Sequence, residues 1–314
     1  MNTEILIVCL NAVLPTFLLM ATGFAARRLK LLDERDVRMM NNLAFKVFMP
    51  AMLFNNIYSS DITSAVRPWL LAYAVIGVLA AFAVSIAYTM LFVHDKKKQS
   101  VYIQGIFRSN FVVIGLPLAS ALMEGEDMAP VAVLMVVVVP LFNVLAVICL
   151  ETFNGRKIKP AAILIDVIKN PLIIASLLGL LFAALHITLP KPIEKTVSDL
   201  GKIGSPLMLF LLGAFFRFDS MRSHAHDLAR ICAMRLIVIP AIFLSIAAAL
   251  GFRGVEFSGL IGVFGSATAV ASFTMAQQMG GDSELAGNIV VATSALCSVT
   301  LYLWSVLFKS LGVI

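Results

Sequence analysis

The sequence predicts an all-α polytopic membrane protein with ten transmembrane helices. Of its 314 residues, 60% are hydrophobic and 13% are charged, whereas an average soluble domain is roughly 45–50% apolar and about 25% charged. The apolar residues form runs of about 20, the length that crosses a bilayer as a helix. Because so few polar residues cannot cover the surface of a soluble protein, the composition excludes a globular enzyme, a disordered chain and a disulfide-stabilised secreted domain.

Each predicted span is bounded by charged residues or by glycine and proline. Basic residues follow span 1 at Arg27 and Arg28, and Lys96–Lys98 separate spans 3 and 4. A Pro-Lys-Pro segment at 190–192 separates spans 6 and 7, and Gly-Gly-Asp at 280–282 separates spans 9 and 10. In chain order, spans 1 to 10 are predicted over residues 4–26, 38–57, 68–93, 100–123, 128–152, 161–186, 197–216, 228–250, 258–279 and 285–308.

The distribution of Lys and Arg predicts the orientation in the membrane. These residues concentrate in the loops after odd-numbered spans, as at Arg27, at Lys96–Lys98 and at Arg222. By the positive-inside rule these loops are cytoplasmic, so both termini lie outside a cytoplasmic (inner) membrane. The net charge of +6 therefore indicates contact with anionic lipid headgroups and not with nucleic acid.

The two halves of the chain resemble each other at a shift of 156 residues. Pro50-Ala-Met-Leu-Phe aligns with Pro206-Leu-Met-Leu-Phe, and each run is preceded by another proline 35 residues earlier. An odd number of spans per half inverts the second half in the membrane, which is typical of secondary transporters. We therefore divide the chain into a first repeat, residues 1–156, and an inverted second repeat, residues 157–314. Pro50 and Pro206 are either hinges of a scaffold or plain packing kinks.

Spans 4 and 9 are predicted to be discontinuous and to cross near the membrane midplane. In span 4, Gly115-Leu-Pro117 follows a polar segment, and span 9 carries a run of small and hydroxyl-bearing residues over 265–274. We expect Gly115 and Pro117 to interrupt span 4, because a proline removes a helical hydrogen bond and a lipid-embedded chain accepts this only beside a cavity or a polar neighbour.

Two half-helix N-termini that meet at the midplane would form a site for an anion, most simply a carboxylate. Each N-terminus has unpaired N–H groups and about half a positive charge. Asn110 has an alternative role, a hydrogen bond that only joins two helices. The hydroxyl-bearing residues have the alternative role of small residues that let helices pack closely. The alternative for Arg108 is that its side chain extends to the cytoplasmic interface of the membrane. The candidate ligands are Asn110, Ser109, Arg108, Ser266, Thr268 and Ser272.

No catalytic or metal-binding cluster is predicted. The four cysteines lie singly in apolar runs, no histidine has a metal partner at ligand spacing, and no nucleophile–base pair or ATP-binding motif occurs. We therefore expect no cofactor and no metal site, while coupling to H⁺, to Na⁺ or to the membrane potential stays open. Sodium could be held by backbone carbonyls of the unwound helices.

These motifs resemble the auxin efflux carrier family over the whole chain. The resemblance rests on the ten-span layout, on Pro50-Ala-Met-Leu-Phe and on Asn110-x4-Gly115-x-Pro117. It implies a fold shared with sodium–bile acid symporters, in which spans 4 and 9 cross. Spans 1, 2, 6 and 7 would form a scaffold, and the others a transport domain that moves like an elevator. It also implies that Asn110 binds substrate. The family's Pro-x-Ala-x-Asn in span 9 is replaced here by Ala267-Thr-Ala-Val-Ala271.

We predict a secondary transporter, an efflux carrier or permease, for a small organic anion. The alternatives are a sodium-coupled symporter of the bile-acid type, an ion channel, and a membrane sensor that has the transporter fold without transport. The expected partners are the anion, membrane lipids and a second copy of the chain through the scaffold spans.

Overall fold

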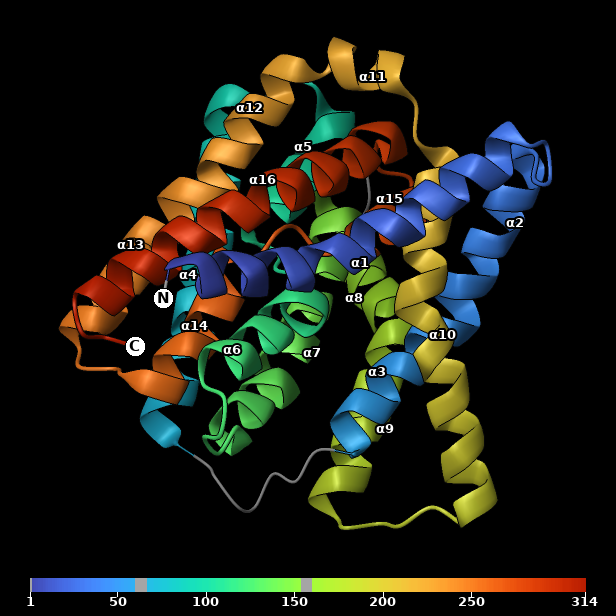
Figure 1. The fold of residues 1–314 in the computed structure, drawn as a ribbon. Coiled ribbons are helices and arrows are strands. Elements are labelled where there is room, and N and C mark those ends of the chain that lie inside the picture. The colour runs from blue at the N-terminus through green and yellow to red at the C-terminus, as the bar shows by residue number, and fades with distance from the viewer. Residues whose placement is uncertain (1, 60–66, 154–159) are drawn as a thin grey trace.

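The computed structural model describes residues 2–59, 67–153 and 160–314, which form helices joined by short connections (Figure 1). The labels α and η mark α-helices and five-residue π-helical segments. The first half of the chain contains α1 (Asn2–Arg28), α2 (Glu34–Leu43), η1 (Ala44–Phe48), α3 (Met49–Tyr58), α4 (Pro68–Phe92), α5 (Lys96–Phe107), η2 (Phe111–Gly115), α6 (Leu116–Leu122) and α7 (Ala129–Phe153). The second contains α8 (Pro160–Lys169), α9 (Pro171–Ala184), α10 (Lys191–Phe215), α11 (Phe218–Ser223), α12 (Ala225–Ala233), η3 (Met234–Val238), α13 (Ile239–Ala249), α14 (Gly254–Gly265), α15 (Ala271–Met279) and α16 (Ser283–Ser310).

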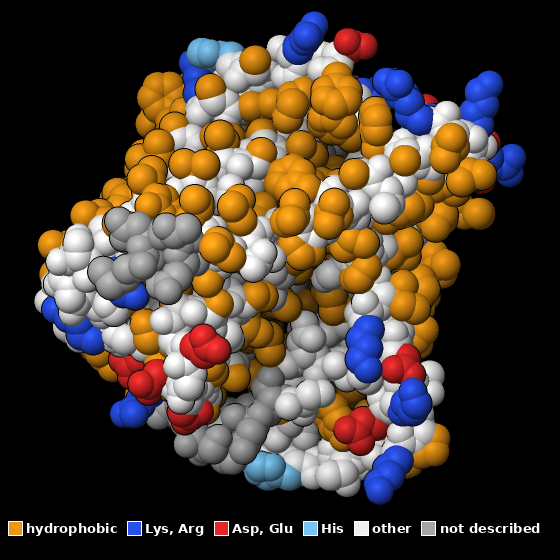
Figure 2. All heavy atoms as spheres, viewed as in Figure 1, with side chains coloured by type: hydrophobic (Ala, Val, Ile, Leu, Met, Phe, Trp, Pro, Cys, Tyr) orange, Lys and Arg blue, Asp and Glu red, His pale blue; other side chains and the backbone are white. Residues whose placement is uncertain are grey.

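Six helical segments within the described ranges are long and apolar enough to cross a membrane, and shorter apolar helices accompany them. Large hydrophobic side chains such as Ile76, Leu91 and Leu177 are more than half exposed on the outside of the bundle. Figure 2 shows such side chains over the middle of the visible face, with charged side chains toward its upper and lower ends. An apolar belt between charged ends is the surface that a bilayer requires. The six long segments are Ile5–Arg28, Pro68–Phe92, Ala129–Phe153, Lys191–Phe215, Ala225–Ala249 and Ser283–Ser310.

Several predicted spans are built from more than one helical segment. Span 6 is divided at Asn170, whose side chain accepts a hydrogen bond from the backbone N–H of Leu172 and caps α9, and Pro171 starts that helix. Spans 4 and 9 each contain a short non-helical segment, at residues 108–110 and 266–270. These interruptions leave backbone groups that other parts of the protein must satisfy.

Three prolines explain the π-helical segments. Each of η1, η2 and η3 ends two residues before a proline, namely Pro50, Pro117 and Pro240. A proline has no N–H to donate and its ring crowds the preceding turn, so the helix widens there instead of breaking. Pro206, by contrast, lies within the regular α-helix α10.

The interruption predicted at Gly115 and Pro117 lies elsewhere. The non-helical segment of span 4 is Arg108–Asn110, and Pro117 is near the start of α6 within a continuous helical stretch. Gly115 has an ordinary right-handed helical backbone, with φ −69° and ψ −44°. The proline therefore widens the helix after the break, and the polar residues before it carry the break itself.

Glycines bring two helices from opposite halves of the chain together. A Cβ on Gly23 would lie 1.8 Å from the carbonyl oxygen of Phe210, and one on Gly213 would lie 1.9 Å from that of Met20. Helices α1 and α10 therefore cross backbone to backbone, as small residues permit inside membranes. Helix α3 packs against α9 and also against α10, the helix that α1 crosses (Figure 1).

Candidate functional site

The two interruptions meet and pair with each other. Ser109 and Thr268 form an antiparallel β-bridge. The backbone N–H of Asn110 donates to the carbonyl of Ala267 at 2.8 Å, and that of Ala269 donates to the carbonyl of Arg108 at 3.4 Å. Spans 4 and 9 therefore cross at their non-helical segments, and this pairing satisfies backbone groups that each break leaves open.

Three of the predicted ligand hydroxyls stabilise the C-terminal ends of α5 and α14. Thr268 Oγ1 donates to the carbonyl of Gly105 at 2.7 Å. Ser109 Oγ and Ser266 Oγ both donate to the carbonyl of Gly262, at 3.1 and 2.7 Å. Because a hydroxyl has a single hydrogen to donate, these side chains offer no free donor to an anion. Their arrangement favours a structural role over the ligand role that the sequence suggested.

A cavity of about 60 Å³ lies beside the crossing, where the helices that follow the two breaks begin. Its wall includes the residues that lead into the helix after each break, 110–113 at the start of η2 and 269–271 at the start of α15. The first N–H groups of a helix have no partner inside that helix, and the helix dipole places partial positive charge there. The cavity therefore lies at two helix ends that carry partial positive charge, and its volume is that of a small chemical group.

Arg108 brings a full positive charge to this cavity. Its side chain is 2% exposed, so it does not extend to the membrane interface. Its guanidinium donates to Asn143 Oδ1 at 2.6 Å, to Gln104 Oε1 at 3.1 Å and to Met275 Sδ at 2.9 Å. All of these acceptors are neutral, and no described carboxylate forms an ion pair with Arg108.

Two other predicted ligands have buried polar atoms without a partner. The amide nitrogen Nδ2 of Asn110, a residue that lines the cavity, has no acceptor. Ser272 Oγ is also unpartnered, but this residue lies beside Gln104 and Thr268 and outside the 60 Å³ cavity. An unsatisfied buried donor is costly unless a ligand completes it. Asn110 therefore has a free amide donor at a residue that lines the cavity, whereas the free hydroxyl of Ser272 lies outside it.

The crossing depends on close contact between two glycines. A Cβ on Gly115 would lie 2.7 Å from the Cα of Gly262 and 2.8 Å from its carbonyl oxygen. We expect Gly115→Ala to lower the free energy of unfolding by about 1–3 kcal/mol, as overpacking does, and thermal unfolding in detergent would measure this. Gly287→Ala is the matched control, because its Cβ would first meet the end of the Leu212 side chain, at 3.1 Å. Equal stability of the two variants would contradict the close contact.

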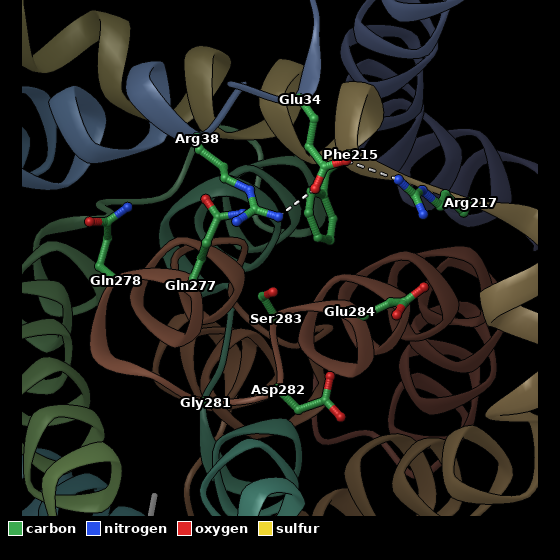
Figure 3. A pocket seen from close by; sticks show the side chains of 10 residues that line it. All are labelled: Glu34, Arg38, Phe215, Arg217, Gln277, Gln278, Gly281, Asp282, Ser283 and Glu284. Atoms are coloured by element: carbon green, nitrogen blue, oxygen red, sulfur yellow. Dashed lines mark hydrogen bonds and ion pairs between the residues drawn. The ribbon is translucent and has the colours of Figure 1, made fainter. Parts of the chain in front are cut away.

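A larger cavity of about 490 Å³ opens at the end of the bundle where α2, α10, α15 and α16 meet (Figure 3). Figure 3 shows Glu34 between Arg38 and Arg217, with which it forms ion pairs. These arginines, and Arg38 most strongly, lower the pKa of Glu34. Among the described residues no group of three His, Cys, Asp or Glu could hold a metal ion. Most of the residues that line this cavity are polar or charged.

The profile of the family described as "Membrane transport protein" matches residues 8–305, nearly the whole chain. The chain belongs to this family. It is the auxin efflux carrier group that the motifs in spans 2 and 4 indicated. With several apolar membrane-spanning helices, the transporter is a multi-pass membrane protein.

Three relatives match this transporter along almost their full length. An "Uncharacterized transporter" of Methanothermobacter thermautotrophicus is 23% identical over 301 residues, 94% of this chain and 97% of its own. The "Uncharacterized transporter MJ1031" of Methanocaldococcus jannaschii is 21% identical, with the same coverage of each chain. A protein of Rhizobium meliloti named "Putative malonate transporter" is 24% identical over 92% of both chains.

The span 9 side of the cavity offers few side-chain donors, since Ala269, Val270 and Ala271 form this part of its wall. Ala271, at one of the positions that differ from the motif noted in the sequence, lines the cavity and offers no side-chain donor. Arg108 and Asn143 contribute polar groups from spans 4 and 5 instead.

Two functional candidates escaped the sequence analysis. Asn143 and Arg235 are 3% and 0% exposed and contact the crossing segments through Arg108 and Ser266. Each is a lone polar residue within an apolar run, and buried polar residues in membranes mark functional sites by default. That signal was present in the sequence, but it does not tell which neighbours such a residue reaches.

Proposed function

We propose that this transporter moves a small organic anion, most simply a carboxylate, through the cavity at the crossing of spans 4 and 9. The observation that carries the proposal is the buried guanidinium of Arg108, which has only neutral hydrogen-bond acceptors. An unpaired buried charge costs several kcal/mol unless a counter-ion joins it. A carboxylate in the cavity would pair with Arg108 and would accept from Asn110 and from free N–H groups of two helix ends.

The position of the cavity supports alternating access by an elevator movement. One part of its wall comes from α3 and α10, at Met52, Ser205 and Met208. Another part comes from residues 108–113 and 269–271 of the crossing. The first group lies in the scaffold of spans 1, 2, 6 and 7, and the second lies in the transport domain. Sliding of the transport domain along the scaffold would carry a bound anion from one side of the membrane to the other.

Ten spans arranged as a five-plus-five inverted repeat account for the antiparallel pairing at the crossing. The fourth span of each half contains a non-helical segment, and the two segments run in opposite directions. Both termini then lie outside the cytoplasmic membrane.

Ser223→Cys, in the exposed segment after span 7, should react with an impermeant thiol reagent only after the membrane is permeabilised. Because all four native cysteines are buried, labelling of intact cells would come from this position and would contradict the orientation.

The substrate is tested with purified protein in liposomes. We expect saturable uptake of at least one member of a panel of mono- and dicarboxylates that includes malonate, since the named Rhizobium meliloti relative points to that compound. Malonamide, which has the same skeleton without charge, should neither be transported nor compete, because it cannot neutralise Arg108. Equal competition by malonamide, or no binding of any carboxylate, would refute the proposed function.

A further inference from the structure

Arg235 lies inside the bundle and reaches the ends of both interrupted helices. It belongs to η3 and is 0% exposed. Among the described residues, the acceptors of its guanidinium hydrogen bonds are all backbone carbonyls. Nε donates to Ser266 at 2.8 Å, Nη2 donates to Val263 at 3.3 Å, and Nη1 donates to Ile106 and Phe107 at 3.4 and 3.2 Å.

These four carbonyls belong to the C-terminal ends of α5 and α14. The last four carbonyls of a helix have no partner inside the helix, and the dipole places about half a negative charge there. Two such ends at one point amount to roughly one negative charge. The single positive charge of the Arg235 guanidinium matches it, and its planar, forked donors can reach several carbonyls at once.

The same arrangement of backbone groups can hold a metal cation. In transporters with discontinuous helices, unwound carbonyls and half-helix C-terminal ends coordinate the coupling Na⁺. Here the guanidinium occupies those carbonyls. No described carboxylate forms an ion pair with Arg235, so nothing else on the described residues offsets its charge apart from the two helix ends.

We propose that Arg235 is a tethered cation that takes the place of a coupling sodium ion at the crossing. It holds the C-terminal ends of α5 and α14 together, and it leaves the N-terminal ends of η2 and α15 free to bind an anion. Binding and transport of the anion are then independent of sodium. The last statement rests on the proposed function, whereas the cation role of Arg235 does not.

The first test compares the wild-type protein in sodium, potassium and choline chloride at equal ionic strength. We expect thermal stability in detergent to be the same in the three salts, and carboxylate affinity to differ by less than twofold. A sodium-specific rise in stability, or carboxylate binding tenfold or more tighter in sodium, would overturn the proposal.

The second test empties the place that the guanidinium fills. We expect Arg235→Ala to lower the melting temperature by about 5 °C or more, and millimolar guanidinium chloride or sodium chloride to restore part of the loss. Such concentrations are far below those that denature proteins. Arg253→Ala is the matched control, since Arg253 also donates to backbone carbonyls, of Ala248 near the end of α13 and of Phe252, but is exposed. Unchanged stability of Arg235→Ala, or a loss that neither cation reduces, would overturn the role.

A third variant keeps the test decisive if Arg235→Ala does not fold. Arg235→Lys retains the charge, so we expect it to fold and to be as insensitive to sodium as the wild type. A sodium-dependent Arg235→Lys would contradict the proposal. These thermal measurements need no carboxylate. A failure of the proposed function would therefore be recognised separately, as wild-type protein that binds no carboxylate while the Arg235 variants behave as expected.

Discussion

Arg108→Gln is expected to weaken carboxylate binding more than about a hundredfold. The substitution leaves a side chain of similar polarity in the cavity wall but removes the only full positive charge that lines the described cavity. Loss of one partner of a buried ion pair costs about 3 kcal/mol or more, which corresponds to a factor of more than about 100 in affinity. Equilibrium binding of a radiolabelled carboxylate to purified protein would measure the effect.

The stability of the Arg108→Gln variant separates a binding role from a structural one. In the absence of ligand the variant should be at least as stable as the wild type, because the buried charge is gone. Arg108→Lys keeps the charge without the fork, and its affinity should lie between those of the wild type and Arg108→Gln. Arg253→Gln, which removes an exposed arginine, should bind as the wild type does. Unchanged affinity of a folded Arg108→Gln would refute the anion site at this cavity.

Asn110→Asp should abolish carboxylate binding while the protein stays folded. The new carboxylate would lie in the same cavity as Arg108 and at the positive end of the helix that begins with η2. It would therefore act as an internal counter-ion and would repel the substrate. We expect an affinity loss of more than about a hundredfold, together with a melting temperature equal to or higher than that of the wild type.

Asn110→Ala tests the amide by itself. It removes the unpartnered Nδ2 donor without adding charge, and a hydrogen bond to a charged acceptor contributes about 1.5–3 kcal/mol, or roughly tenfold to more than a hundredfold in affinity. The order of affinities should thus be wild type, then Asn110→Ala, then Asn110→Asp. If Asn110→Ala binds as tightly as the wild type and is less stable, the side chain joins helices and does not bind the anion.

The all-helical, multi-pass character of the chain and the pairing of spans 4 and 9 could be predicted from sequence for a simple reason. A lipid-facing helix needs about 20 apolar residues, and that requirement is visible along the chain without any knowledge of packing. The polar segment Arg108-Ser109-Asn110 stands out in an apolar run for the same reason. The sequence therefore identifies both spans that contain the paired segments, spans 4 and 9.

The exact break and the roles of the hydroxyls required the structure. Pro117 was expected to interrupt span 4, yet a proline in an early helical position needs no N–H, and a π-helical segment absorbs its ring. Ser266 and Thr268 were expected to bind the anion, but carbonyls of Gly262 and Gly105 lie within reach of their hydroxyls. Local sequence does not reveal which of several acceptors a short polar side chain meets.

The sequence by itself determined a multi-pass helical membrane protein of the auxin efflux carrier family, because composition, periodicity and local motifs are properties of the linear chain. Only the tertiary structure decided which charges and helix ends share a cavity. Arg108 meets Asn143 across 35 residues of sequence, and Arg235 meets the carbonyl of Phe107 across 128. Such contacts arise from the packing of helices that are distant in the chain, where a buried charge is tolerated only if the fold brings hydrogen-bond partners to it.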